Sequence, residues 1–154
     1  MRSRLRDPVA VLPAADRPAR ELLDAVRAGG VDVRTLELVR LRVSQINGSA
    51  AGVEAAAGAA RAAGVGDAPL TAVAVWRDSP CFTPAQRAAL GLAEAATRLA
   101  DRPEAVSDRV WDRAATHYDE KGLAALILLI GVTNLFDRLD TTTRRIAGAA
   151  APRN

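Results

Sequence analysis

Two side chains in this sequence have obvious reactive chemistry, and each is the only one of its type. Cys81 is the single cysteine and His117 the single histidine among 154 residues. A cysteine reacts as its thiolate, which the nearby Arg77 and Arg87 would favour, so Cys81 is a candidate one-cysteine peroxidase. His117 is a candidate for proton transfer. The ordinary roles are a free, partly buried cysteine and a structural or surface histidine.

Glu37 is a third candidate, because its position suggests a partly buried carboxylate. It lies on the same helical column as Val33 and Leu41. Two roles fit such a carboxylate: an ion pair with Arg34 or Arg40, or a proton carrier in a reaction.

The charged residues suggest neither a metal site nor a nucleic-acid surface. The acidic residues form no metal-ligand cluster with the single histidine, and we expect no metal or cofactor. Net charge is +3, and 20 of the 21 basic residues are arginine. These arginines are scattered and mostly close to an acidic residue, without an aromatic stacking platform. We therefore expect a mixed-charge surface that does not bind nucleic acid.

Composition favours helices over sheets as the elements that position these side chains. The chain is 49% hydrophobic but only 3% aromatic, so its core must be built from Ala, Leu, Val and Ile. The most apolar run, residues 123–136, is too short to span a bilayer and indicates a buried core helix. An N-terminal apolar signal segment is not evident, so we expect a cytoplasmic protein.

Helix-start signals recur along the chain, whereas strand alternation and internal repeats do not. They predict an all-α single domain of six or seven helices over residues 16–140. An extended lead-in, 1–15, precedes it, and a tail, 141–154, follows. The expected start residues are Asp16, Asp32, Ser49, Asp67, Thr83, Ser107 and Asp119.

Five segments, in order, resemble one branch of a known family. They are residues 37–48, the Trp-Arg turn at 74–80, and segments 82–90, 117–123 and 134–139. Together they resemble the alkylhydroperoxidase D-like (AhpD-like) branch of the carboxymuconolactone decarboxylase family. The resemblance implies a helical bundle and a homo-oligomer, either a trimer or a hexamer.

The resemblance also identifies four positions at which this branch carries its functional residues. Its pattern is a Glu, a Cys twelve residues later, a second Cys three further on, and a His four beyond that. In this sequence the four positions hold Glu37, Ser49, Gly52 and Ala56. Only the Glu is kept.

This loss removes the chemistry of a dithiol peroxidase. A helix N-terminus favours the attacking thiolate, and a second cysteine resolves the resulting sulfenic acid. Ser49 has no such oxidation chemistry and no evident base, so its expected role is to cap a helix. Gly52 and Ala56 cannot replace a thiol or a proton carrier.

Three hypotheses for function remain. The first is a redox-inactive homologue, a pseudoenzyme kept as a structural protein or as a binder of a small molecule. The second is an enzyme that uses Glu37, His117 or Cys81, since decarboxylases of the wider family work without a cysteine pair. The third is residual alkylhydroperoxidase (peroxiredoxin-type) or antioxidant activity. A ligand-sized pocket beside Glu37 would favour an enzyme or a ligand-binding protein. A cavity filled by neighbouring side chains, with Glu37 bonded to an arginine, would favour a structural role.

Overall fold

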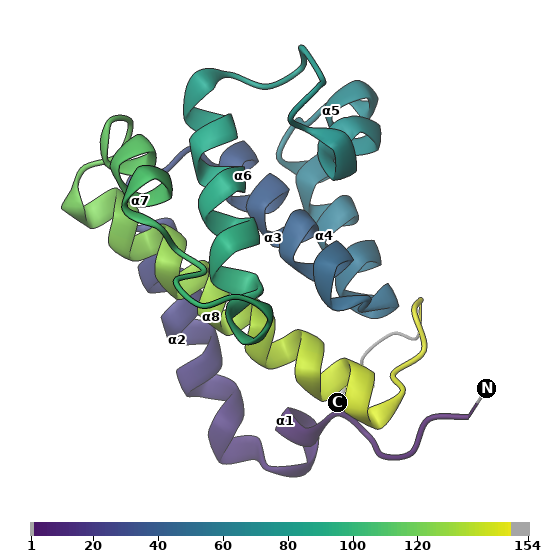
Figure 1. Ribbon diagram of the computed structural model, residues 1–154. Helices are drawn as coiled ribbons and strands as arrows, with labels where there is room; N and C mark the ends of the chain where they lie inside the picture. The colour runs from purple at the N-terminus through teal and green to yellow at the C-terminus, as the bar shows by residue number, and fades with distance from the viewer. Residues whose placement is uncertain (1, 149–154) are drawn as a thin grey trace.

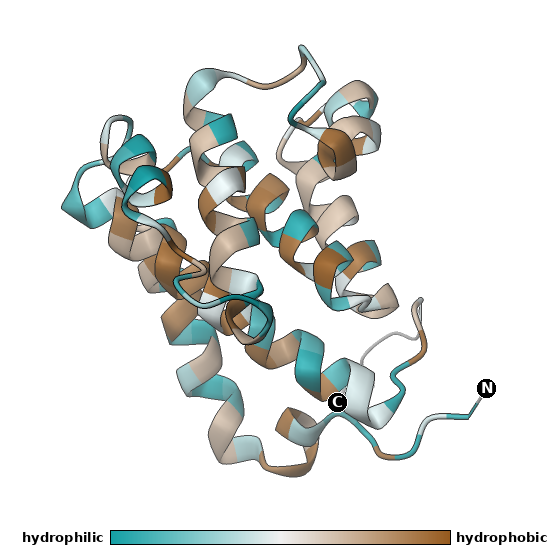
Figure 2. Ribbon diagram, in the orientation of Figure 1, coloured by the Kyte–Doolittle hydropathy of each residue, from teal (hydrophilic) through white to brown (hydrophobic). Residues whose placement is uncertain are grey.

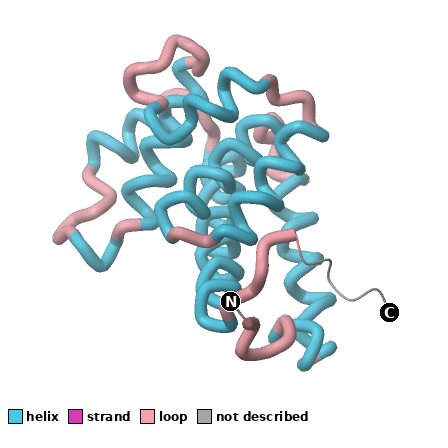
Figure 3. Tube along the Cα trace, turned by 90° about the vertical axis from the view of Figure 1, so that its right-hand side faces the viewer, coloured by secondary structure: helices cyan, strands magenta, loops and turns pink. Residues whose placement is uncertain are grey.

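The computed structural model describes residues 2–148, and within that range the chain forms helices and no strands (Figures 1 and 3). Short 3₁₀ turns lie at 13–15, 73–75 and 99–101. The all-α prediction is confirmed. The α-helices in this range are α1 (Pro8–Val11), α2 (Asp16–Arg27), α3 (Val33–Asn47), α4 (Ala50–Ala62), α5 (Asp67–Ala72), α6 (Pro84–Thr97), α7 (Asp108–Ala115) and α8 (Glu120–Thr143).

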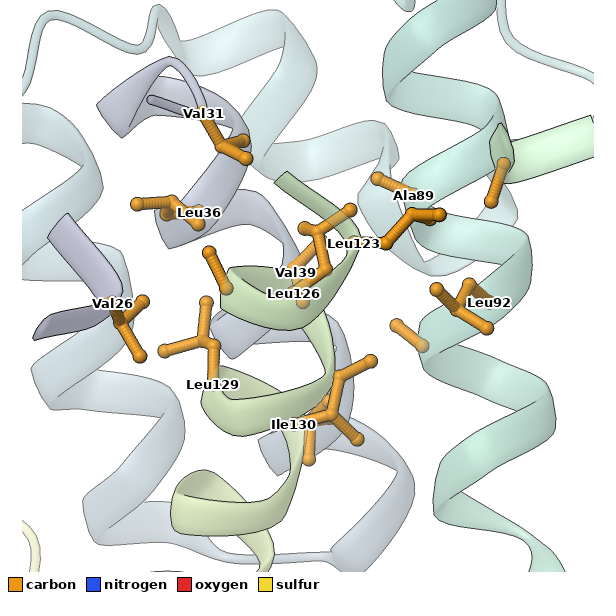
Figure 4. Close-up of a cluster of buried hydrophobic side chains, with 14 of the residues drawn as sticks. Val26, Val31, Leu36, Val39, Ala89, Leu92, Leu123, Leu126, Leu129 and Ile130 are labelled. Atoms are coloured by element: carbon orange, nitrogen blue, oxygen red, sulfur yellow. The ribbon is translucent and has the colours of Figure 1, made fainter. Parts of the chain in front are cut away.

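Helix α3 lies at the centre and packs against α4, α6 and α8, while α2 packs along α8. The core has two parts. In the first, aliphatic side chains of α2, α3, α6 and α8 meet, among them Val26, Val39, Leu92 and Leu126 (Figure 4). The second lies under α4 and α5 and includes the buried Trp76. A core so poor in aromatic residues fits closely packed helices, as the composition predicted.

Four of the predicted caps form, because their side chains accept a hydrogen bond from a backbone N–H of the first turn. They are Asp32, Ser49, Thr83 and Asp119. Thr83 is also part of a reciprocal capping box with Gln86. The Asp16 prediction was wrong, because Asp16 lies inside α2. Ser107 precedes α7, but its side chain makes no capping hydrogen bond.

The predicted extended lead-in is partly helical. Asp7 caps the short helix α1, whose first residue is Pro8, a residue well suited to that position. The segment before it lies beside the end of α8, where the Arg4 backbone N–H donates to Thr143 O at 2.8 Å. Helix α8 runs to Thr143, so the first residues of the predicted tail are helical. Residues 149–154 of that tail lie outside the described range.

The apolar run at 123–136 belongs to a longer helix than expected. Helix α8 is the one described helix whose length and composition would allow it to cross a membrane, and 56% of its most apolar window is buried inside the protein. Its first half is the more hydrophobic, and its C-terminal end is polar (Figure 2). Such burial is typical of a core helix.

Candidate functional site

Ser49 acts as the cap of α4. Its side chain is buried, and Ser49 Oγ accepts a hydrogen bond from the Gly52 backbone N–H at 3.1 Å. No other side chain between residues 2 and 148 hydrogen-bonds to this hydroxyl, so it has no general base. The geometry is that of a helix cap and provides no activation of a nucleophile.

Gly52 leaves no room for a side chain. An ideal Cβ placed there would lie less than 3.0 Å from Asp137 Oδ1, Ser44 Oγ and Ser49 Oγ. The space that a second cysteine would need is therefore occupied by a carboxylate from α8 and a hydroxyl from α3. The site has lost its thiols and is also filled by polar groups.

Asp137 is a buried carboxylate held by uncharged donors. It is only 2% exposed, and it accepts hydrogen bonds from Ser44 Oγ at 2.9 Å and from Asn47 Nδ2 at 2.8 Å. No cation is bonded to it within residues 2–148. It does lie beside the first turn of α4, where the helix dipole favours a negative charge. Asp137 thus occupies the electrostatic position that the family gives to a thiolate.

A pocket of about 530 Å³ opens beside this carboxylate, between α3, α4, α8 and the chain that follows α8. Its wall combines apolar and charged side chains, among them Leu23, Phe136, Ile146, Arg40, Ser44, Glu54, Asp137, Asp140 and Arg145.

Both arginines of this pocket are already paired with carboxylates. Arg40 lies 3.5 Å from Glu37, and Arg145 lies 3.3 Å from both Asp7 and Asp140. Burial raises the pKa of Asp140, as do the nearby charges of Asp7 and Asp137, although Arg145 partly opposes the shift. The pocket wall holds three carboxylates, Glu54, Asp137 and Asp140, and its two arginines are shared with Glu37 and Asp7, so negative charge is in excess.

Glu37 is not part of this pocket wall. Its side chain is 12% exposed and faces Arg40, so of the two predicted partners only Arg40 pairs with it. Arg34 pairs with Asp32 instead. Glu37 Oε2 is buried and makes no hydrogen bond to the part of the chain that the structure describes. The pocket criterion for function is therefore met only in part. A ligand-sized pocket exists, but Arg40 lines it and Glu37 does not.

Ala56 is completely buried in the second part of the core. Its neighbours there include Leu38, Leu41 and Ala60. The space that a histidine side chain would need is therefore filled by close packing.

Cys81 is exposed rather than partly buried, in the turn before α6. The two arginines that were expected to favour a Cys81 thiolate have other partners. Arg77 pairs with Glu94 at 2.5 Å and stacks on Trp76, 4.4 Å from the ring centroid. Arg87 donates to four backbone carbonyls of the turn between residues 76 and 82.

His117 is also exposed, and it lines a different pocket beside α7. The structure therefore does not bring Glu37, Cys81 and His117 together. Within the described chain, no group of three or more His, Cys, Asp or Glu side chains could hold a metal ion.

Glu94, which no pattern in the sequence singled out, is buried at the junction of α3, α6 and the Trp76–Arg77 turn. It bonds Arg42 at 2.6 Å, Arg77 at 2.5 Å and Trp76 Nε1 at 3.1 Å. Burial opposes its ionisation, but these three donors outweigh that effect and lower the pKa of Glu94. Asp137 was also missed, because its partners Ser44 and Asn47 are about ninety residues away in sequence.

Comparison with known proteins identifies the family. Residues 13–95 match the model of the carboxymuconolactone decarboxylase family, and the chain belongs to this family. The chain is similar to the uncharacterised protein YdfG of Bacillus subtilis, with 29% identity over 113 residues, which are 73% of this chain and 76% of YdfG. It is also similar to the uncharacterised protein YnjA of Escherichia coli, with 43% identity over 72 residues, which are 47% of this chain and 38% of YnjA.

Solved structures share the fold over almost the whole chain. A protein of unknown function from Agrobacterium tumefaciens, described as a candidate antioxidant defence protein AhpD, matches with a TM-score of 0.87 and 26% identity. The match covers 96% of this chain and 99% of that one. The debrominase Bmp8 matches with a TM-score of 0.81 and 17% identity, covering 93% of this chain and 76% of that one, which supports the fold alone. The AhpD-like fold is confirmed.

Proposed function

We propose that this protein is a redox-inactive member of its family that binds a small molecule in the pocket beside Asp137. The observation that carries the proposal is the contact of Asp137 with Gly52. A carboxylate and a hydroxyl fill the space of the missing cysteine side chain. The single cysteine of the chain is exposed elsewhere, so this site has no thiol to oxidise.

The pocket supports binding of a ligand with an apolar body and a cationic group. Its apolar side chains, such as Leu23 and Phe136, offer burial, and its volume of about 530 Å³ suits a small molecule. Among residues 2–148, two side chains donate hydrogen bonds to Asp137, and its carboxylate has acceptor capacity for a third donor. Because Arg40 and Arg145 are neutralised by their own partners, an amine would meet an uncompensated carboxylate.

Thermal-shift titration with benzylamine as the probe tests this proposal. Benzyl alcohol, which has the same ring but no charge, is the control ligand. We expect benzylamine to raise the melting temperature saturably and more than the alcohol does. Asp140→Asn, which removes one pocket carboxylate, should reduce the preference for the amine. Equal shifts from the two ligands, or no shift from either, would contradict a cation-binding pocket.

We further propose that the protein is a homo-oligomer, a trimer or hexamer as the family resemblance implies. The supporting observation is an apolar stripe on α8 that faces outward. Ile127, Leu128 and Leu135 are 43–50% exposed, and Leu135 follows Leu128 two turns later on the same side of the helix. Burial of this stripe against a second copy would remove apolar surface from water.

A further inference from the structure

A second pocket, formed by residues distant in sequence from Gly52, is lined by arginines that lie far apart in the sequence. It has a volume of about 540 Å³ and lies between the Trp76–Arg77 turn, the start of α6 and the end of α7. Its charged lining is Arg77, Arg87, Arg113 and His117. An adjoining hollow of about 180 Å³ shares three of these residues and adds Arg109.

Most arginines of this pocket have no carboxylate partner among residues 2–148. Within that range only Arg77 has one, Glu94, which Arg42 also shares. Arg87 directs its N–H groups to the carbonyls of residues 76, 77, 79 and 82, which fixes its guanidinium but leaves its charge uncompensated. Arg87 therefore contributes a positive field from a rigid position.

Arg109 and Arg113 lie one turn apart on α7, and His117 follows four residues later. Among residues 2–148 no carboxylate forms an ion pair with Arg109 or Arg113, and both residues are exposed. Like charges at this spacing repel each other and destabilise a helix. A cleft that collects one sign of charge without partners concentrates ions of the opposite sign.

We propose that this pocket binds a small molecule through a dianionic oxyanion group, as in a phosphate monoester or a dicarboxylate. Arg113 and Arg109 supply free guanidinium forks, which pair with such oxygens in bidentate fashion. Arg87 and Arg77 supply the surrounding positive field. A nucleic-acid strand fits less well, because Trp76 is 4% exposed and offers no face for base stacking.

Isothermal titration calorimetry on the 154-residue chain at constant ionic strength tests the inference. Inorganic phosphate, which is largely a dianion above pH 7, represents the phosphate class, and malonate represents the dicarboxylates. Arg113→Gln and Arg109→Gln remove free forks, whereas Arg98→Gln removes one charge from an exposed arginine outside both hollows. All three side chains are exposed, so melting curves should show that the variants fold.

We expect saturable binding of at least one probe, with one site per chain. Arg113→Gln and Arg109→Gln should each weaken it about tenfold, while Arg98→Gln should leave it unchanged. The tighter of the two probes identifies the class of oxyanion. Absence of saturable binding of both probes, or equal weakening by Arg98→Gln, would overturn the inference.

Discussion

Asp137 lies beside the N-terminus of α4, where the helix dipole favours a negative charge. In the AhpD-like branch a thiolate benefits from that position. Here a carboxylate from another helix takes it, with Ser44 and Asn47 as donors. The helix start keeps its preference for an anion, while the redox group is gone.

A residue-scale prediction follows from the close contact at Gly52. Gly52→Ala should lower the free energy of unfolding by about 2 kcal/mol, because the new methyl group must displace Asp137 or Ser44. Urea denaturation measures the change.

Gly58→Ala is the matched control, in the same helix but with no atom within 4 Å of the added Cβ. It should raise stability by about 0.5–1 kcal/mol, since alanine favours helix more than glycine does. Equal stability of Gly52→Ala and Gly58→Ala would contradict the close approach of Asp137 to Gly52.

At the residue scale the sequence revealed what is missing but not what replaced it. The spacing of Glu37, Ser49, Gly52 and Ala56 identified the lost motif. Asp137 and Glu94 were not identified, because each depends on partners brought close only by helix packing. Burial of Cys81 was also mispredicted, since one residue in a turn carries no periodicity that would reveal its exposure.

At the scale of elements, Glu94 joins α3, α6 and the Trp76–Arg77 turn. Glu94→Gln should lower the free energy of unfolding by about 3 kcal/mol at neutral pH, because Arg42 is then left largely buried without a countercharge. The control Glu21→Gln removes an exposed carboxylate paired with Arg17 and should cost less than about 0.5 kcal/mol.

The pH dependence of this difference has a definite sign. The folded-state pKa of Glu94 lies below its ordinary value of 4.5, so its ion pairs stabilise the protein above that pH. The gap between wild type and Glu94→Gln should narrow as the pH falls below 4.5 in urea titrations. A gap that is constant from pH 7 to pH 3 would argue against an ionised Glu94.

A second element-scale prediction concerns the start of α4. Ser49→Ala should destabilise the protein by about 1 kcal/mol, because the Gly52 N–H loses its acceptor. Ser107→Ala is the comparison, at the N-cap of α7 but without a side-chain capping bond, and should change stability little. Equal effects in thermal melts would count against a capping role for Ser49.

Among the features of the helices, their N-terminal ends were predicted best from the sequence. An N-cap depends only on residues within one helical turn. Asp32, Ser49, Thr83 and Asp119 formed the expected bonds. Helix α1 was not predicted, because four residues are too few to show helical periodicity. The position of α1 also depends on the preceding residue Arg4, whose backbone N–H bonds the end of α8.

At the scale of the whole molecule, the exposed stripe on α8 predicts self-association. Leu128→Lys should shift native mass spectra toward the monomer, because a charge would be buried between copies. Leu99→Lys, at a residue that is 63% exposed on another part of the surface, should leave the assembly unchanged. A monomeric wild-type protein would rule out the proposed oligomer.

The central claim is that this family member has no peroxidase chemistry. The most direct test is dithiol-dependent consumption of hydrogen peroxide by the wild-type protein, with Cys81→Ser and heat-inactivated protein as controls. The account predicts that all three samples consume peroxide at the same background rate. Turnover by the wild type that is lost in Cys81→Ser would assign a peroxidase to the exposed cysteine and contradict the claim.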